Sequence, residues 1–107
     1  MQRDRLPVAD EMKSHAAKAA ALLKELANPS RLLILCQLVD GEKSVGELCR
    51  TVDLSQSAVS QHLARLREAS LVDTQKRGQM VYYRLCNMEA HALLSTLYLI
   101  YCKRVMY

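Results

Sequence analysis

Residues 44–69 read SVGELCRTVDLSQSAVSQHLARLREA and predict a helix-turn-helix. Apolar residues recur at helical spacing up to Val52, and Asp53 and Leu54 then interrupt the pattern. Ser55 is suited to cap a second helix, because its hydroxyl accepts hydrogen bonds from the amides that follow it. An apolar stripe with i, i+4 and i+7 spacing points inward from this second helix, and it consists of Val59, Leu63 and Leu66.

The outward face of the second helix carries polar side chains suited to a DNA major groove. A helix fits this groove, where each base pair presents a distinct pattern of donors and acceptors. The alternative is an ordinary helical hairpin with a solvated face. The candidate DNA-contacting residues of this helix are Gln56, Ser57, Ser60, Gln61 and Arg65.

Residues 71–85 predict a β-hairpin directly after the helix-turn-helix. Both halves are rich in β-forming residues, and Gly78 lies in the polar tip, where a positive φ is needed. A helix-turn-helix followed by a hairpin with a basic tip is typical of a winged helix. Residues 55–85 contain five basic and two acidic side chains, a net charge of +3. We therefore expect the wing residues Lys76 and Arg77 to meet phosphates of a DNA duplex.

Length and composition predict one domain, residues 1–107, that is mainly α-helical, with five helices and the hairpin wing. The formal net charge of +4 is compatible with a nucleic-acid partner. No apolar run is long enough to span a membrane, and the polar start lacks the apolar region of a signal peptide. We expect a cytoplasmic protein that has reduced thiols and no membrane association.

Helices are also predicted on both sides of this unit. Residues 9–27 are rich in alanine and leucine, Asn28 followed by Pro29 starts a second helix that ends before Asp40, and residues 88–106 form a long last helix. The first and last helices are predicted to form a homodimer surface that presents two recognition helices to two half-sites. In the alternative, both helices only close the core of the monomer. The last helix has more apolar residues than a small domain buries: Leu93, Leu94, Leu97, Ile100 and Tyr101.

Three segments together resemble the ArsR/SmtB family of dimeric winged-helix repressors. They are LANPSRLLILCQL at residues 26–38, SVGELCRTVDLSQSAVSQHLARLREASLV at 44–72, and VYYRL at 81–85. The resemblance extends from about Ala16 to the C-terminus. It implies a transcriptional repressor that binds double-stranded operator DNA in the absence of inducer and is released when an inducer occupies the sensor site.

The metal ligands found in that family match this chain only in part. One family site uses a Cys-x-Cys pair, and here Cys49 lacks the second thiolate. Another site uses two pairs of acidic and histidine ligands, of which Glu89 and His91 match the first pair alone. Zinc needs about four N, S or O ligands. We expect no metal and no other cofactor, and a metal-responsive repressor is the alternative function.

The cysteines are at positions 36, 49, 86 and 102, and no CxxC spacing supports a thiol enzyme. ILC in the second helix and LYLIYC in the last resemble the persulfide-sensing branch of the family, the BigR-, SqrR- and HlyU-like repressors. That resemblance implies that a reactive sulfur species, a persulfide or polysulfide, or an oxidant links Cys36 to Cys102 and releases the DNA. By itself, Cys36 is equally typical of a buried inert thiol. Cys49 and Cys86 are interpreted as packing thiols.

Overall fold

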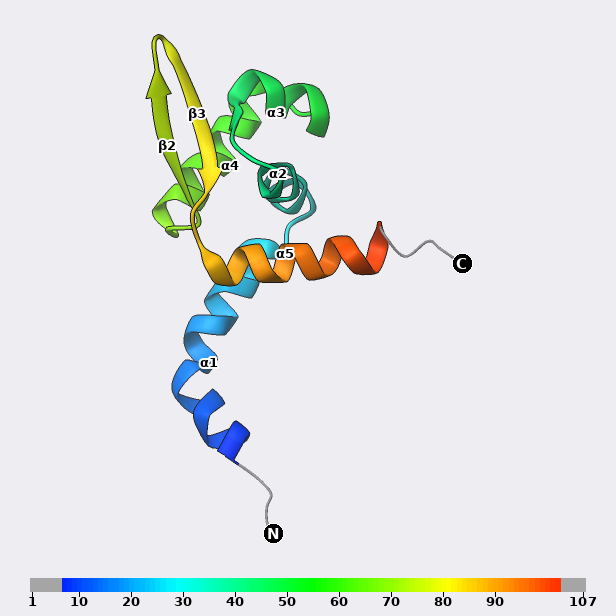
Figure 1. Ribbon diagram of the computed structural model, residues 1–107. Coiled ribbons are helices and arrows are strands. Elements are labelled where there is room, and N and C mark those ends of the chain that lie inside the picture. Colours follow the sequence, from blue (N-terminus) through cyan, green and yellow to red (C-terminus); the bar gives the residue numbers. More distant parts are fainter. Residues whose placement is uncertain (1–6, 103–107) are drawn as a thin grey trace.

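The computed structural model describes residues 7–102, which form five helices and a three-stranded antiparallel sheet (Figure 1). This arrangement confirms the predicted mainly helical winged helix-turn-helix. The elements in chain order are α1 (Pro7–Leu26), α2 (Pro29–Val39), β1 (Lys43–Ser44), α3 (Val45–Val52), α4 (Gln56–Glu68), β2 (Val72–Arg77), β3 (Met80–Leu85) and α5 (Met88–Tyr101).

The break between α1 and α2 forms as predicted. The Asn28 side chain accepts a hydrogen bond from the amide of Arg31 at 3.0 Å, and Pro29 occupies the first turn, where its missing N–H costs nothing. Leu26, at the end of α1, is buried. The rest of α1 extends away from the other helices, as Figure 1 shows.

Local capping interactions set the limits of α3 and α4. The amide of Glu47 donates to Ser44 Oγ at 3.2 Å, and the Glu47 carboxylate accepts from the amide of Ser44 at 2.8 Å. Asp53 ends α3 in the left-handed conformation, with φ of 55°. Ser55 caps α4 by accepting from the amide of Ala58 at 3.1 Å. The predicted apolar stripe of α4 is fully buried: Val59, Leu63 and Leu66.

The wing is the predicted hairpin of β2 and β3, and Gly78 adopts φ of 62° at its tip. The prediction of two strands was incomplete, because β1 adds a third strand. Lys43 pairs with Tyr83 and Ser44 with Tyr82, so β3 lies between β1 and β2. A strand of two residues has no periodicity that a sequence pattern can reveal. It ties the wing to the start of the helix-turn-helix.

The core is centred on α2, which packs against α5, α3 and α4. Leu94 of α5 is fully buried in this core. Its assignment to the dimer surface was therefore wrong, since the monomer already covers it. The described part of α5 ends at Tyr101, with Cys102 as its cap, and residues 103–106 of the predicted last helix lie outside the described residues. Within residues 7–102, no helix is both long and apolar enough to cross a membrane.

Candidate nucleic-acid interface and thiol site

The first half of α4 exposes the polar side chains that were predicted from the sequence to contact DNA. Burial of the apolar stripe turns the opposite face outward, and the first turn of α4 contains no acidic residue that would repel phosphates. The face has hydroxyl and amide groups, which can donate and accept hydrogen bonds at base edges. Its members are Gln56, Ser57, Ser60 and Gln61, all exposed.

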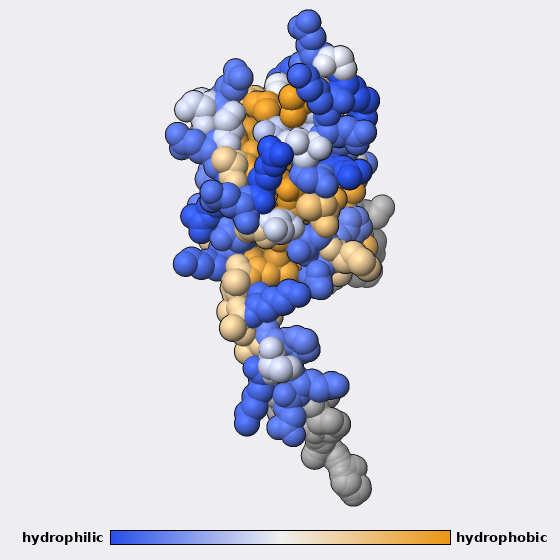
Figure 2. Space-filling model, turned by 90° about the vertical axis from the view of Figure 1, so that its left-hand side faces the viewer, coloured by the Kyte–Doolittle hydropathy of each residue, from blue (hydrophilic) through white to orange (hydrophobic). Residues whose placement is uncertain are grey.

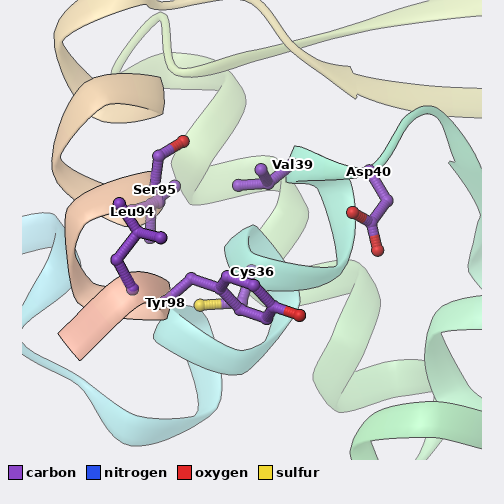
Figure 3. A pocket seen from close by; sticks show the side chains of 7 residues that line it. Cys36, Val39, Asp40, Leu94, Ser95 and Tyr98 are labelled. Atoms are coloured by element: carbon purple, nitrogen blue, oxygen red, sulfur yellow. The ribbon is translucent and has the colours of Figure 1, made fainter. Parts of the chain in front are cut away.

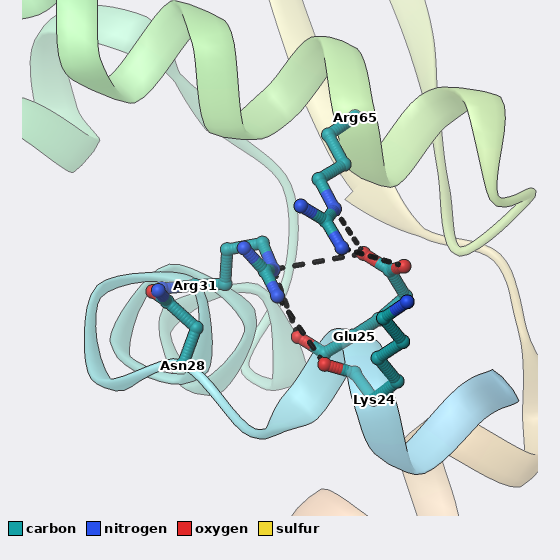
Figure 4. Close-up of polar contacts among 5 residues, drawn as sticks. All are labelled: Lys24, Glu25, Asn28, Arg31 and Arg65. Atoms are coloured by element: carbon teal, nitrogen blue, oxygen red, sulfur yellow. Dashed lines mark hydrogen bonds and ion pairs between the residues drawn. The ribbon is translucent and has the colours of Figure 1, made fainter. Parts of the chain in front are cut away.

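Arg65, assigned to the same set, is placed differently. It lies in the last turn of α4, where its guanidinium is directed at α1 and pairs with the carboxylate of Glu25 (Figure 4). Nε donates to Oε1 at 2.8 Å and Nη2 donates to Oε2 at 3.3 Å. To reach a phosphate, Arg65 must first leave this carboxylate.

The two wing cations also differ from each other. Lys76 is exposed near the hairpin tip. Arg77 pairs with Glu42, which directly precedes β1, and its guanidinium lies 4.3 Å from the centroid of the Tyr82 ring. This stack is a cation–π contact that fixes the direction of the arginine.

Folding lowers the local positive charge below the value counted along the sequence. Glu25 and Glu42 lie outside residues 55–85, yet they pair with Arg65 and Arg77 of that segment. Adding these two carboxylates and Arg31, which also pairs with Glu25, to the segment's net charge of +3 leaves +2. The ion pairs join residues 40 and 35 positions apart, so no local sequence signal reveals them.

The second candidate site is a thiol pair between α2 and α5. Cys36 of α2 is half-buried and lines a cavity of about 250 Å³ together with Leu94 and Tyr98 of α5. Figure 3 shows Cys36 and Tyr98 among the side chains that line this cavity. Cys102 is exposed at the end of α5, and its amide donates to the Tyr98 carbonyl at 2.8 Å. No sequence pattern indicated that Tyr98 would line this cavity.

The environment of Cys36 disfavours its charged form. Burial raises the pKa of the Cys36 thiol, and electrostatic repulsion from Cys102 raises it further. Cys36 is therefore protonated at neutral pH, whereas the exposed Cys102 is the more accessible nucleophile. Both are free cysteines in the structure.

The other two cysteines lie elsewhere. Cys49 is half-buried in α3, and Cys86 follows β3, where its thiol lies 3.7 Å from the Ser70 carbonyl. A metal site has no support from side-chain positions, because residues 7–102 contain no cluster of three or more His, Cys, Asp or Glu side chains arranged to hold an ion.

Comparison with known proteins assigns this architecture to a family. A family model described as "Bacterial regulatory protein, arsR family" matches residues 28–74. The transcriptional activator HlyU of Vibrio cholerae serotype O1 is 52% identical over 93 residues, which cover 87% of this chain and 86% of the relative. The biofilm growth-associated repressor of Agrobacterium fabrum is 45% identical over 91 residues, covering 85% of this chain and 78% of the relative.

Solved structures give the same result. The transcriptional repressor BigR from Xylella fastidiosa has a TM-score of 0.83 at 40% identity, covering 88% of this chain and 96% of that chain. Reduced HlyU from Vibrio cholerae has a TM-score of 0.81 at 52% identity, covering 86% of this chain and 97% of that chain. These similar proteins include both an activator and repressors. The chain belongs to the arsR family of bacterial regulatory proteins, and it is a winged helix-turn-helix, DNA-binding transcription regulator, not an enzyme.

Proposed function

We propose that this regulator is a dimeric repressor that binds operator DNA while Cys36 and Cys102 are reduced and leaves it when a sulfur bridge joins them. The observation that carries the proposal is the position of Cys36 in a cavity between α2 and α5, with Cys102 at the end of the same helix α5. The resemblance to HlyU and BigR supports the same pairing. A regulator of DNA acts in the cytoplasm, where thiols are kept reduced.

The DNA contacts divide by chemistry. The exposed amides and hydroxyls in the first half of α4 suit base edges, because the N-terminal part of a recognition helix enters the major groove. We assign Lys76 to a contact with a DNA phosphate. Arg77 reaches a phosphate only if its guanidinium leaves the Glu42 carboxylate. The base-reading residues are Gln56, Ser57, Ser60 and Gln61.

The proposed dimer uses α1 and α5. A groove of about 710 Å³ lies between these helices, with Leu22 and Leu93 among its apolar walls. Figure 2 shows hydrophobic residues in a hollow beside the point where α1 leaves the body. Three further apolar residues of α5 are at least half exposed: Leu99, Ile100 and Tyr101. A second copy of the chain is the occupant that removes this apolar surface from water and pairs two recognition helices.

The bridge forms with an organic trisulfide, RS–S–SR, in two exchange steps. The Cys102 thiolate attacks the central sulfur, and one RS⁻ leaves. The Cys36 thiol then loses its proton to solvent, and its thiolate attacks the same central sulfur and expels the second RS⁻. The product is a Cys36–S–Cys102 bridge. Two thiolates are oxidised, and the trisulfide is reduced to two RS⁻.

The bridge acts on DNA through helix packing. Cys36 lies on α2, which contacts both α4 and α5, so a new bond between α2 and the end of α5 changes the relative positions of the recognition and dimerisation helices. A tenfold loss of DNA affinity requires only about 1.4 kcal/mol of coupling. This lies within the usual range for allosteric proteins.

Mass spectrometry tests the proposal directly. Reduced protein is treated with glutathione trisulfide, alkylated and digested, and the Cys36 and Cys102 peptides are expected to be joined with the mass of one added sulfur. The matched control is the double variant Cys49→Ser/Cys86→Ser, which is expected to give the same bridge. Joined peptides that contain Cys49 or Cys86 in place of this pair, or retention of a stoichiometric metal by the untreated protein, contradict the proposal.

A further inference from the structure

Glu25 joins three helices at the point where α1 ends. Its carboxylate accepts two hydrogen bonds from Arg65 of α4, at 2.8 and 3.3 Å, and its Oε1 lies 3.6 Å from Nε of Arg31 in α2 (Figure 4). The paired arrangement of a guanidinium and a carboxylate fixes direction as well as distance. The Glu25 side chain is only 15% exposed.

Arg31 holds the same junction from the other side. It is buried, and it donates to the carbonyls of Glu25 at 2.9 Å and Lys24 at 3.2 Å. The Glu25 carbonyl lies in the last turn of α1, where helical partners run out, and the Lys24 carbonyl accepts from the amide of Ala27 as well. The hydrogen bond from Arg65 is the main cause that lowers the pKa of Glu25, so the carboxylate is charged at neutral pH. The hydrogen bonds from Arg31 thus fix the last turn of α1 to α2. The Glu25 carboxylate adds a contact with α4 through Arg65.

We propose that Glu25 is a positioning residue for DNA binding: it holds the recognition helix α4 against α1 through Arg65, and Arg65 acts on DNA through Glu25 and not through a phosphate. Helix geometry supports this role. Bases are read by the first half of α4, whereas Arg65 lies in its last turn. A link at that end sets the tilt of the helix, and a small tilt displaces the side chains at the opposite end.

The two possible roles of Arg65 predict opposite changes in DNA affinity for the substitution Glu25→Gln. If Arg65 contacts a phosphate, Glu25→Gln releases it from a competing carboxylate and raises DNA affinity. If Glu25 positions α4, the same change weakens the link and lowers affinity. Glutamine keeps the size of the side chain and removes its negative charge, and the hydrogen bonds from Arg31 to the backbone carbonyls of α1 are unaffected. The sign of the change therefore distinguishes the roles.

The experiment measures fluorescence anisotropy over a salt series. The probe is a duplex that the wild-type protein selects from a random-sequence library. Glu25→Gln and Arg65→Gln are each expected to lower affinity about fivefold, and the double variant by no more than either single one. The slope of log affinity against log salt is expected to stay unchanged, because no phosphate contact is lost.

Arg65→Lys and Glu68→Gln complete the test. Lysine keeps the charge and can still contact a phosphate, but it lacks the two-pronged geometry that Glu25 holds, so affinity is expected to fall. Glu68→Gln removes one negative charge from an exposed site on α4 and controls for charge alone. Thermal melts of every variant monitor folding. A higher affinity for Glu25→Gln, a shallower salt slope for Arg65→Gln, or wild-type affinity for Arg65→Lys overturns the proposal.

Discussion

The guanidinium of Arg77 lies over the ring of Tyr82, 4.3 Å from its centroid, while it also pairs with Glu42. Arg77 ends β2, Tyr82 belongs to β3, and Glu42 precedes β1, so one side chain connects both strands of the wing to the residue before β1. Lys76, its neighbour, takes part in none of these contacts among the described residues. Of these two adjacent cations, Arg77 is therefore held by neighbouring side chains, whereas Lys76 is not held by these contacts.

This difference gives a prediction for the wing. Lys76→Ala is expected to weaken binding to selected and random duplexes alike and to reduce the salt slope by about 1 per protomer, because one phosphate contact is lost. Arg77→Ala is expected to lower affinity as well, and to destabilise the hairpin. Anisotropy over a salt series, with Gln79→Ala at the tip as control, measures both effects. An unchanged salt slope for Lys76→Ala contradicts the phosphate assignment.

The polar face of α4 gives a prediction about specificity. Gln61→Ala or Ser60→Ala is expected to cost about 1–3 kcal/mol on the selected duplex and to leave random-sequence binding nearly unchanged. The physical reason is that a lost base contact affects only the sequence that it reads. Competition between the two duplexes measures the difference. An equal loss on both duplexes for Gln61→Ala argues against base reading.

The proposed dimer is tested at Leu93, which lines the groove between α1 and α5 and is 36% exposed. Leu93→Glu is expected to give a folded monomer with much weaker operator binding, because an unpaired charge in an interface is costly. Leu94 is unsuitable for this test, since it is fully buried and glutamate there unfolds the monomer. Sedimentation and circular dichroism measure assembly and folding.

Leu33→Glu is the matched control for assembly, because Leu33 is exposed on α2 and does not line the groove between α1 and α5. This variant is expected to remain a dimer and to bind DNA. A dimeric Leu93→Glu protein with wild-type affinity contradicts the proposed interface.

Local signals predicted most of the fold. Asn28, Ser55 and Gly78 each satisfy a requirement of their immediate backbone, and each was placed correctly. What the sequence did not reveal depends on distant segments. The β1 strand exists because β3 pairs with it, and Glu25 meets Arg65 across 40 positions. Periodicity identifies an apolar face without telling whether the monomer or a partner covers it.

Glu25 also gives a prediction about pH. Its pKa lies below the usual value in the folded protein, chiefly because of the hydrogen bond from Arg65. The stability it contributes is therefore present above the ordinary carboxyl pKa and is lost as the pH falls through the folded pKa. Glu25→Gln is expected to lower the Tm by about 1–6 °C at pH 7, and this difference is expected to shrink as the pH falls from about 5 through the lowered pKa of Glu25. A difference that is constant over this range excludes the ion pair as its source.

The thiol switch gives the last prediction, which concerns DNA release. Cys36→Ser and Cys102→Ser are each expected to bind the selected duplex like the wild type, since neither thiol belongs to the proposed DNA-contacting surface. After treatment with glutathione trisulfide, both variants are expected to stay bound, while the wild type loses affinity about tenfold or more. Cys49→Ser and Cys86→Ser are expected to respond like the wild type. Anisotropy before and after treatment, followed by reduction with dithiothreitol, measures release and its reversal.

The two single variants also separate the order of the chemical steps. Cys36→Ser is expected to hold one glutathione-derived adduct on Cys102, because the exposed thiol reacts first and no second thiol resolves the adduct. Cys102→Ser is expected to react slowly at neutral pH, because the raised pKa of Cys36 keeps that thiol protonated, and faster as the pH rises toward that pKa. Release of DNA by treated Cys102→Ser as readily as by the wild type contradicts a switch that needs both sulfurs.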